Sequence, residues 1–455
     1  MGLGGLYGLS RDALLANGYA LQVTGQNVSN VNSPGYARRV AKLETGNSGD
    51  GGVIARGLER ITDRFADSRF YNANGFSSGS EARSSALGGV DELFADVSGT
   101  GLGDSMGAFF SSFSELSVNP SDKTLRSHVL DTAATMTERF RTTSTQLNSI
   151  RDELKTRAQD AVAQINALAK DLAVLNGKIQ TATATGGDGA DLQDQRDRLI
   201  EDLSGYINVD TFTDNSGRFV IRGGGATLVE ASSASTLTAV PDVAGNLQYS
   251  LLSGSVTMNI TNLVTGGTLA GLRQARDTDV KTALTSLDQL ALDLGTAINT
   301  QHAAGFGLDG VTGRNFFQLA GAATAGTMVV DPAMVGQPDR VGAASSAGTL
   351  PGGSDNAIEL FKISDKKVIN GATRTPAEGY GDLIGDVGMR KQAADREATT
   401  RSAMTDQTKS LRESARGVSM DEEMVSLSRY QRAYEAASKL LQTVDSLIEG
   451  LIRDV

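Results

Sequence analysis

Both ends of the chain carry apolar residues at a seven-residue step. This spacing is typical of a helix with a narrow apolar seam of the coiled-coil kind. One helix cannot bury such a seam by itself, so the two terminal helices must pack on each other, on the rest of the protein or on neighbouring chains. The predicted seam residues are Tyr7, Leu14, Leu21 and Val28 near the N-terminus, and Leu427, Tyr430, Tyr434, Leu441, Val444, Ile448 and Leu451 near the C-terminus.

The heptad pattern alone leaves two arrangements about equally open. In the first, the terminal helices pair only with each other within one chain. In the second, they form a bundle with helices of other chains. Small residues beside the seams, such as Ala20 and Ala433, would let a third helix approach closely, which favours assembly.

The two terminal helices differ in intrinsic stability. The N-terminal helix is predicted from about residue 3 to residue 31, where Pro34 forces a turn. Glycines recur within it, and each interior glycine costs about 1 kcal/mol relative to alanine. We therefore expect this helix to be disordered or fraying in a monomer and to order only against a partner. The C-terminal helix begins at Ser419, which forms a capping-box pattern with Glu422.

Composition excludes several classes of function. A chain of 455 residues with 39% hydrophobic and 21% charged residues is ordinary for a protein that builds apolar cores. The net charge of -11, without a basic cluster, argues against nucleic-acid binding. The chain has no cysteine, so disulfides and thiolate metal sites are excluded. We find neither a membrane-spanning stretch nor a Sec-type signal peptide.

The middle of the chain predicts an α+β fold that is predominantly α-helical. The longest helix is expected at residues 121–183, where a second heptad pattern runs along a rod of about 90 Å. Alternating apolar residues over 208–263 predict a small β-rich insertion. The other helices are expected at residues 60–75, 81–97, 104–117, 191–206, 269–302 and 380–416.

These elements suggest three domains. Residues 1–36 and 417–455 would form a terminal coiled-coil assembly domain. Residues 37–207 and 264–416 would form a helical core domain, which includes the long helix and an irregular segment at 304–380. Residues 208–263 would form the β-rich insertion domain.

The sequence contains no recognisable constellation for chemistry. His128 and His302 stand far apart on predicted helices, and we expect both to be partly exposed. Asp191, Asp194 and Asp197 alternate with arginines, which is typical of a solvated helix face. We therefore predict that the protein is not an enzyme and that it has no catalytic, cofactor-binding or metal-binding residues.

Two terminal segments resemble a known family. Residues 26–39, QNVSNVNSPGYARR, are similar to the N-x-x-N-x-x-T/S-P-G-Y signature of the bacterial flagellar axial proteins, which form the rod, the hook and the hook-associated structures. Residues 417–452 resemble the C-terminal signature of the same family, and segments at 113–130, 192–209 and 297–317 resemble its hook-associated members. The residues that match the turn signature are Asn27, Asn30, Pro34, Gly35 and Tyr36.

The resemblance implies a structural role outside the cell. Such proteins leave the cytoplasm unfolded through the flagellar type III apparatus, without a cleaved signal, and those that join hook and filament assemble as a ring. The implied partners are the hook protein, a second junction protein called hook-associated protein 3, further copies of the chain, and a cytosolic export chaperone at the C-terminal helix. No cofactor, nucleic acid or membrane partner is implied.

Two alternatives stay open at this point. A hook or rod subunit would share both terminal signatures, but the long helix at 121–183 argues against it. A secreted enzyme carried on an axial scaffold would need a site within 208–263 or 304–380, and neither segment supplies a convincing motif.

Overall fold

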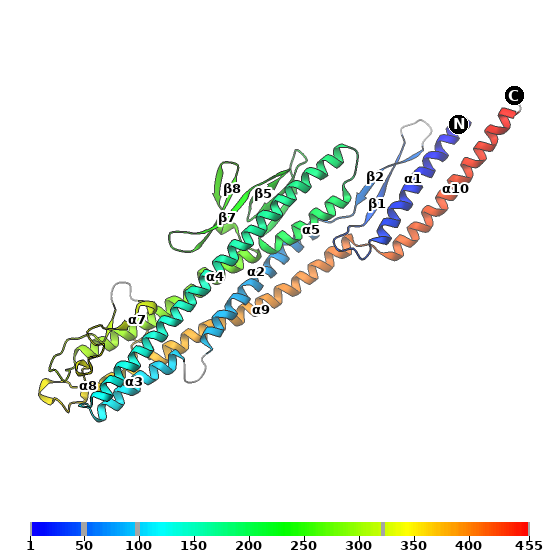
Figure 1. The fold of residues 1–455 in the computed structure, drawn as a ribbon. Coiled ribbons are helices and arrows are strands. Elements are labelled where there is room, and N and C mark those ends of the chain that lie inside the picture. The colour runs from blue at the N-terminus through cyan, green and yellow to red at the C-terminus, as the bar shows by residue number, and fades with distance from the viewer. Residues whose placement is uncertain (1, 47–51, 96–100, 320–323, 454–455) are drawn as a thin grey trace.

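The protein is an elongated bundle of helices with both ends of the chain at the same tip. The computed structural model describes residues 2–46, 52–95, 101–319 and 324–453. Figure 1 shows the long helices lying side by side along the molecule, with the terminal helices projecting beyond the others. The predominantly helical α+β fold predicted from the sequence is therefore confirmed.

The longest helix is α4 (Lys123–Ala184), which matches the helix expected at 121–183. Asp122 caps its first turn by accepting hydrogen bonds from the N–H groups of Thr124 and Leu125. The other long helices are α2 (Arg64–Phe94) and α9 (Pro376–Arg416), which pack against each other. The shorter helices α3 (Leu102–Val118) and α5 (Ala190–Tyr206) both contact α4.

The two helices predicted at 60–75 and 81–97 are in fact one continuous helix, α2. Gly75 and Gly79 of α2 lie against helix α6 (Gly267–Gln274), and a Cβ added to Gly79 would come within 2.9 Å of the Gly267 carbonyl oxygen. These glycines allow a close approach between two backbones and do not end a helix. The prediction of a break was wrong because this contact depends on residues far along the chain.

The helix expected at 269–302 is interrupted by a wider turn. After α6 comes the π-helical segment η2 (Ala275–Val280), and then α7 (Lys281–Ala303). Within η2, Arg276 donates to the carbonyl oxygens of Arg151 on α4 and of Gly245, at 3.0 and 2.8 Å. The π-helical segment thus ties α4 to a turn of the β-rich segment.

The strands form small antiparallel sheets. A hairpin of β1 (Arg39–Thr45) and β2 (Val53–Arg60) follows the N-terminal helix. Strands replace helices between 209 and 259, as the alternating pattern predicted. They form a four-stranded sheet of β3 (Val209–Thr213), β4 (Phe219–Gly223), β5 (Ala226–Glu230) and β6 (Ser233–Ala234), and a three-stranded sheet of β7 (Thr236–Pro241), β8 (Leu247–Ser253) and β9 (Val256–Asn259).

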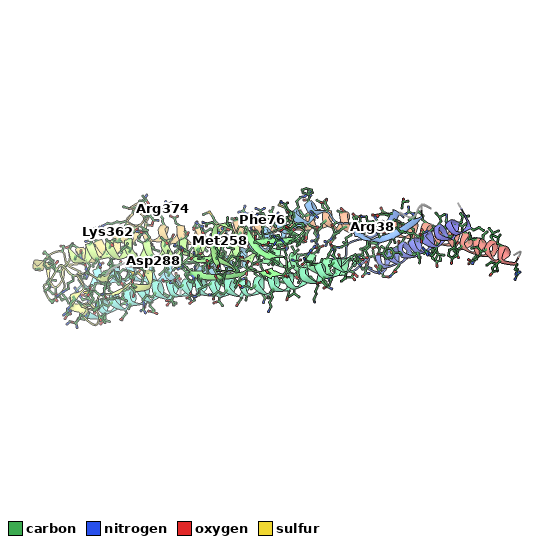
Figure 2. All side chains as sticks on the ribbon, turned by 90° about the horizontal axis from the view of Figure 1, so that it is seen from above. Arg38, Phe76, Met258, Asp288, Lys362 and Arg374 are labelled. Carbon is green, nitrogen blue, oxygen red and sulfur yellow. The ribbon has the colours of Figure 1, made fainter. Side chains whose placement is uncertain are left out.

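The β-rich segment lies along α4. Asn166 of α4 donates to the carbonyl oxygen of Leu237 at 2.9 Å and accepts from the N–H of the same residue at 2.8 Å. Figure 2, which turns the molecule by 90°, shows Met258 over the middle of the bundle and Arg38 near the terminal helices.

The tip far from the termini is built mainly from short elements and a cluster of aromatic rings. Phe109 of α3 packs against Phe113, Phe316 and Phe317, with ring centroids 5.3–5.7 Å apart. The short elements here are β10 (Phe317–Gln318), β11 (Val329–Val330), α8 (Asp355–Phe361), and the single-turn helices η3 (Ala325–Thr327), η4 (Pro338–Arg340), η5 (Ala347–Thr349) and η6 (Lys362–Asp365).

His302 is buried at this tip, contrary to the sequence prediction. Its Nδ1 donates to the Arg314 carbonyl oxygen at 2.8 Å, and its Nε2 accepts from the Gly342 N–H at 3.0 Å. Burial lowers the pKa of His302 to about 4, so the ring is neutral at pH 7. Its hydrogen-bond partners Arg314 and Gly342 lie in loops, and the helical pattern around His302 gives no sign of them. His128, by contrast, is exposed as predicted.

No helix in the described part of the chain is long and apolar enough to span a bilayer.

Candidate assembly site

The terminal helices α1 (Leu3–Ser29) and α10 (Met420–Arg453) pack side by side, as Figure 1 shows. Gly18 of α1 faces Tyr434 of α10, because a Cβ added to Gly18 would lie 3.5 Å from the tyrosine ring. Helix α1 also contacts the β1–β2 hairpin. Pairing of the two ends within one chain, which the heptads left open, is therefore present.

The pairing covers the predicted seams only in part. Among the seam residues, Val444 alone is buried, while Tyr7, Tyr434 and Leu451 are exposed. The half-buried seam residues are Leu14, Leu21, Val28, Leu427, Tyr430, Leu441 and Ile448. The fully buried residues of α1 lie on another line: Ser10, Ala16, Ala20, Val23, Thr24 and Asn27.

Helix α10 also carries an apolar line of which the sequence analysis named only Leu451 and missed Leu440 and Leu447. Leu440, Leu447 and Leu451 are 40%, 52% and 54% exposed in the single chain. Their seven- and four-residue steps place them on one face of the helix. This spacing was visible in the sequence, but the prediction followed the neighbouring heptad, which shares only Leu451 with this line. An apolar helix face left open in this way is typical of a surface that binds another helix.

The turn signature folds into a hydrogen-bonded joint below α1. The buried amide of Asn27 donates to the Arg39 carbonyl oxygen at 2.8 Å and to Glu423 Oε2 at 3.0 Å. Its Oδ1 accepts from the Tyr36 hydroxyl at 2.9 Å and from the Arg39 N–H at 3.0 Å. Two donors and two acceptor lone pairs are all that an amide offers, so Asn27 is fully satisfied. Burial raises the pKa of Tyr36, which keeps its hydroxyl a donor.

The remaining signature residues fix the turn itself and its place on α5. Asn30 donates to the Gln26 carbonyl oxygen at 2.9 Å. Gly35 has a φ of +78°, a conformation that favours glycine, and a Cβ added there would lie 2.7 Å from the Arg198 Cγ. Arg198 of α5 in turn donates to the Pro34 carbonyl oxygen at 3.1 Å.

Arg38 links the hairpin to the start of α10. Its Nε donates to Glu423 at 2.7 Å, and a second guanidinium nitrogen lies 3.0 Å from Glu422. Its backbone N–H donates to the carbonyl oxygen of Arg416, the last residue of α9. The acidic residues Glu422 and Glu423 at the start of α10 therefore hold the hairpin.

The acidic residues of α5 form a buried ion-pair network, which corrects the prediction of a solvated face. Asp194 is 5% exposed and binds Arg39 at 2.7 Å and Arg60 at 2.6 Å. Asp197 also binds Arg60, at 2.6 Å. Burial alone would lower the pKa of Arg60, but the charges of Asp197 and Asp194 raise it. Of the three carboxylates, Asp191 is largely exposed, as predicted, although it too pairs with Arg39.

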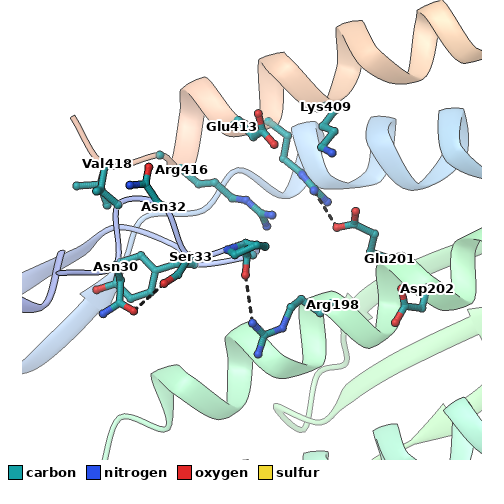
Figure 3. Close-up of a pocket in the computed structure, with 16 residues that line it drawn as sticks. Asn30, Asn32, Ser33, Arg198, Glu201, Asp202, Lys409, Glu413, Arg416 and Val418 are labelled. Carbon is teal, nitrogen blue, oxygen red and sulfur yellow. Dashed lines mark hydrogen bonds and ion pairs between the residues drawn. The ribbon is translucent and has the colours of Figure 1, made fainter. Parts of the chain in front are cut away.

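The joint borders a cleft of about 540 Å³. Figure 3 shows it between the signature turn, α5 and the last turns of α9. In the described residues there is no group of three or more histidine, aspartate or glutamate side chains placed to hold a metal ion.

Comparisons with known proteins find two flagellar family models and several flagellar relatives. Residues 87–317 match the model of the flagellar hook-associated protein FlgK helical domain, and residues 413–453 match the C-terminal model of the flagellar basal body rod FlgEFG proteins. Flagellar hook-associated protein 1 of Salmonella typhimurium is 26% identical, with 95% of this chain and 96% of the relative covered. That of Bacillus subtilis is 27% identical, with 97% and 96% covered.

A solved structure has the same fold. The flagellar hook junction protein FlgK of Burkholderia pseudomallei superimposes with a TM-score of 0.69 at 14% sequence identity, over 76% of this chain and all of the other. The helical-domain model covers just over half of the 455 residues, and the rod-protein model covers all of α10. The chain therefore belongs to the FlgK family of flagellar hook-associated proteins.

Proposed function

We propose that this protein joins the flagellar hook to the filament by bundling its α1–α10 pair with those of neighbouring copies in a ring. The observation that carries this proposal is the open apolar line of Leu440, Leu447 and Leu451 on a helix that is already paired. Full burial of a leucine contributes roughly 1.5–3 kcal/mol. A neighbouring terminal helix that covered this line would therefore stabilise the assembly at every copy.

The hydrogen-bonded joint below α1 would fix the angle between the α1–α10 pair and the core. Asn27 and Arg38 connect the end of α1 and the start of α10 to the hairpin, and Asp194 connects the hairpin to α5. Because Asn27, Glu423 and Asp194 are buried in these contacts, we expect the helix pair to be held at a fixed angle to the core. A subunit of a closed ring needs such an angle, since each copy must meet the next in the same way.

The remaining partners follow from the family and are part of the proposal. The hook protein would lie below the ring, and hook-associated protein 3 above it. Export would proceed unfolded through the flagellar type III apparatus to the cell exterior. A cytosolic chaperone would bind α10 before export, and the exposed apolar side chains of this helix are what such a chaperone would cover.

A charge placed on the open line tests the proposal. In a strain that lacks its own copy of the gene, Leu440→Asp with Leu447→Asp should give hooks without filaments and flagellin shed into the medium. The matched control is Met389→Asp, since Met389 is 66% exposed on α9, outside the terminal pair. Normal filaments with the double variant would refute the proposed use of α10.

The alternative of a hook or rod subunit predicts another outcome. Purified protein mixed with hook fragments should stop at one terminal ring if it is a junction subunit. A hook or rod subunit would instead extend the fragments, which electron microscopy distinguishes directly.

A further inference from the structure

The cleft at the joint is lined by charged side chains from two helices. Helix α9 contributes Lys409, Arg412, Glu413 and Arg416, and α5 contributes Arg198, Glu201 and Asp202. Figure 3 shows the α5 and α9 side chains facing each other across this space. Four cationic groups thus stand beside three carboxylates of the lining, and a fourth carboxylate, that of Asp67, pairs with Arg416.

Arg412 has hydrogen-bond donors that the described residues do not use. It is 2% exposed, its guanidinium stacks on the Phe70 ring at 3.7 Å, and one nitrogen donates to Glu201 at 2.8 Å. Its other two nitrogens, Nε and Nη1, are buried and meet no acceptor in the described part of the chain.

Arg416 has the same property one helical turn later. It is 4% exposed, and the carboxylate oxygen of Asp67 lies 3.7 Å from its Nη1, beyond hydrogen-bond distance. This nitrogen too is buried without an acceptor among the described residues. The charge of Arg416 is thus paired with Asp67, but a buried N–H group without an acceptor still costs about 1–3 kcal/mol. Two such groups line one cleft.

We propose that this cleft receives a carboxylate side chain from a second copy of this chain, an inference that rests on the ring assembly proposed above. A carboxylate accepts two parallel hydrogen bonds from a guanidinium group, which suits the unused donors of Arg412 and Arg416. The cleft borders the signature turn at the base of the α1–α10 pair, which is the pair that the proposed function bundles with neighbouring copies. The net charge of -11 makes exposed carboxylates abundant on every copy.

Cross-linking from the cleft tests the proposal. The chain has no cysteine, so Lys409→Cys gives one attachment point for a thiol-linked photoreactive probe on the cleft lining. In rings formed on isolated hooks, the probe should cross-link to a segment of another copy that contains Asp or Glu. Cross-links only within the same chain, or only to the hook protein, would overturn the inference. If the labelled protein does not attach to hooks although unlabelled protein does, the probe blocks attachment. The charge variant described next then tests the inference.

A charge variant gives a second, independent readout. Arg416→Gln should weaken ring formation about tenfold, which corresponds to ~1.4 kcal/mol. Lys170→Gln is the matched control, since Lys170 is an exposed cation on α4 away from the cleft, and it should leave ring formation unchanged. Equal ring formation by both variants would overturn the inference, whereas no ring by the wild-type protein would overturn the proposed function instead.

A small-anion site is the competing outcome. If sodium acetate raises the melting temperature of the free wild-type protein but not that of Arg416→Gln, and copies do not cross-link, the cleft binds free carboxylates and the second-copy assignment is wrong.

Discussion

The Asn27 amide donates a hydrogen bond of 3.0 Å to Glu423, a residue 396 positions away. This contact joins the end of α1 to the first turn of α10. The same amide also holds the Arg39 backbone, so one side chain fastens the terminal pair and the hairpin together. The turn signature thus acts as a joint between the projecting helices and the core.

Replacing Asn27 should weaken this joint. Asn27→Ala removes four hydrogen bonds and leaves the buried Glu423 carboxylate short of a donor, so we expect a loss of roughly 1–3 kcal/mol in unfolding free energy. Asn17→Ala is the control, because Asn17 on the same helix bonds only the Ala13 carbonyl oxygen. Denaturant unfolding of both variants measures the difference, and equal losses would contradict the role of Asn27.

Gly35 should tolerate a methyl group less well than a glycine of identical conformation. Gly35 and Gly217 both have a φ of +78°, but an added Cβ meets the Arg198 side chain at 2.7 Å in the first case and nothing within 4 Å in the second. Gly217→Ala should cost about 1–2 kcal/mol from the left-handed backbone alone. Gly35→Ala should cost more in the same unfolding assay. A smaller cost would mean that Arg198 moves aside freely.

Asp194 should matter far more than Asp191, although both bind Arg39. Asp194→Asn leaves two buried guanidinium groups, those of Arg39 and Arg60, without their shared charge, and breaking a buried pair costs about 3–5 kcal/mol. Asp191 is exposed, and surface pairs contribute about 0–1 kcal/mol. In thermal unfolding, Asp194→Asn should lower the melting temperature far more than Asp191→Asn does. Similar melting temperatures for the two variants would count against the buried network.

His302 should make the protein less stable in mild acid. Burial lowers its pKa in the folded chain from 6.5 to about 4, so between these values the unfolded state binds a proton that the folded state does not. This contribution to stability is complete above pH 6.5, falls as the pH drops from 6.5 to 4, and changes no further below that. The total loss is about 3 kcal/mol.

Two variants isolate this effect in urea unfolding at pH 7 and pH 5. His302→Gln retains a donor and an acceptor but cannot titrate, so the difference in stability between the two pH values should shrink. His128→Gln changes an exposed histidine and should keep the wild-type difference. An unchanged difference in His302→Gln would show that other groups cause the acid sensitivity.

The long helices were predictable because their apolar periodicity is local. The helix at Lys123–Ala184 differs from its predicted bounds by only one or two residues, and the alternation after residue 208 indicated the strands correctly. The gap predicted between residues 75 and 81 was wrong. Gly75 and Gly79 lie there against the backbone of α6, which comes almost 200 residues later in the chain. The wider turn at Ala275–Val280 likewise leaves no periodic sign in the sequence.

The site was predictable in its residues but not in its contacts. The signature residues Asn27, Pro34, Gly35 and Tyr36 were singled out by resemblance. The structure places the last three in the turn after α1, where the Tyr36 hydroxyl donates to Asn27 on that helix. The ion pairs around Asp194 were missed because i, i+3 spacing looks the same on a solvated face and on a face that meets arginines from a distant hairpin. Only the fold brings those arginines to it.

Accessibility of the open α10 face before and after assembly tests the central claim most directly. Leu440→Cys and Leu447→Cys would each provide the only thiol of the chain, with Met389→Cys as an exposed control on α9. We predict that maleimide labels all three in the free protein, and that in rings on isolated hooks it labels only the control. Equal labelling of Cys variants at 440 and 447 in free and assembled protein would contradict a bundle built through this face of α10.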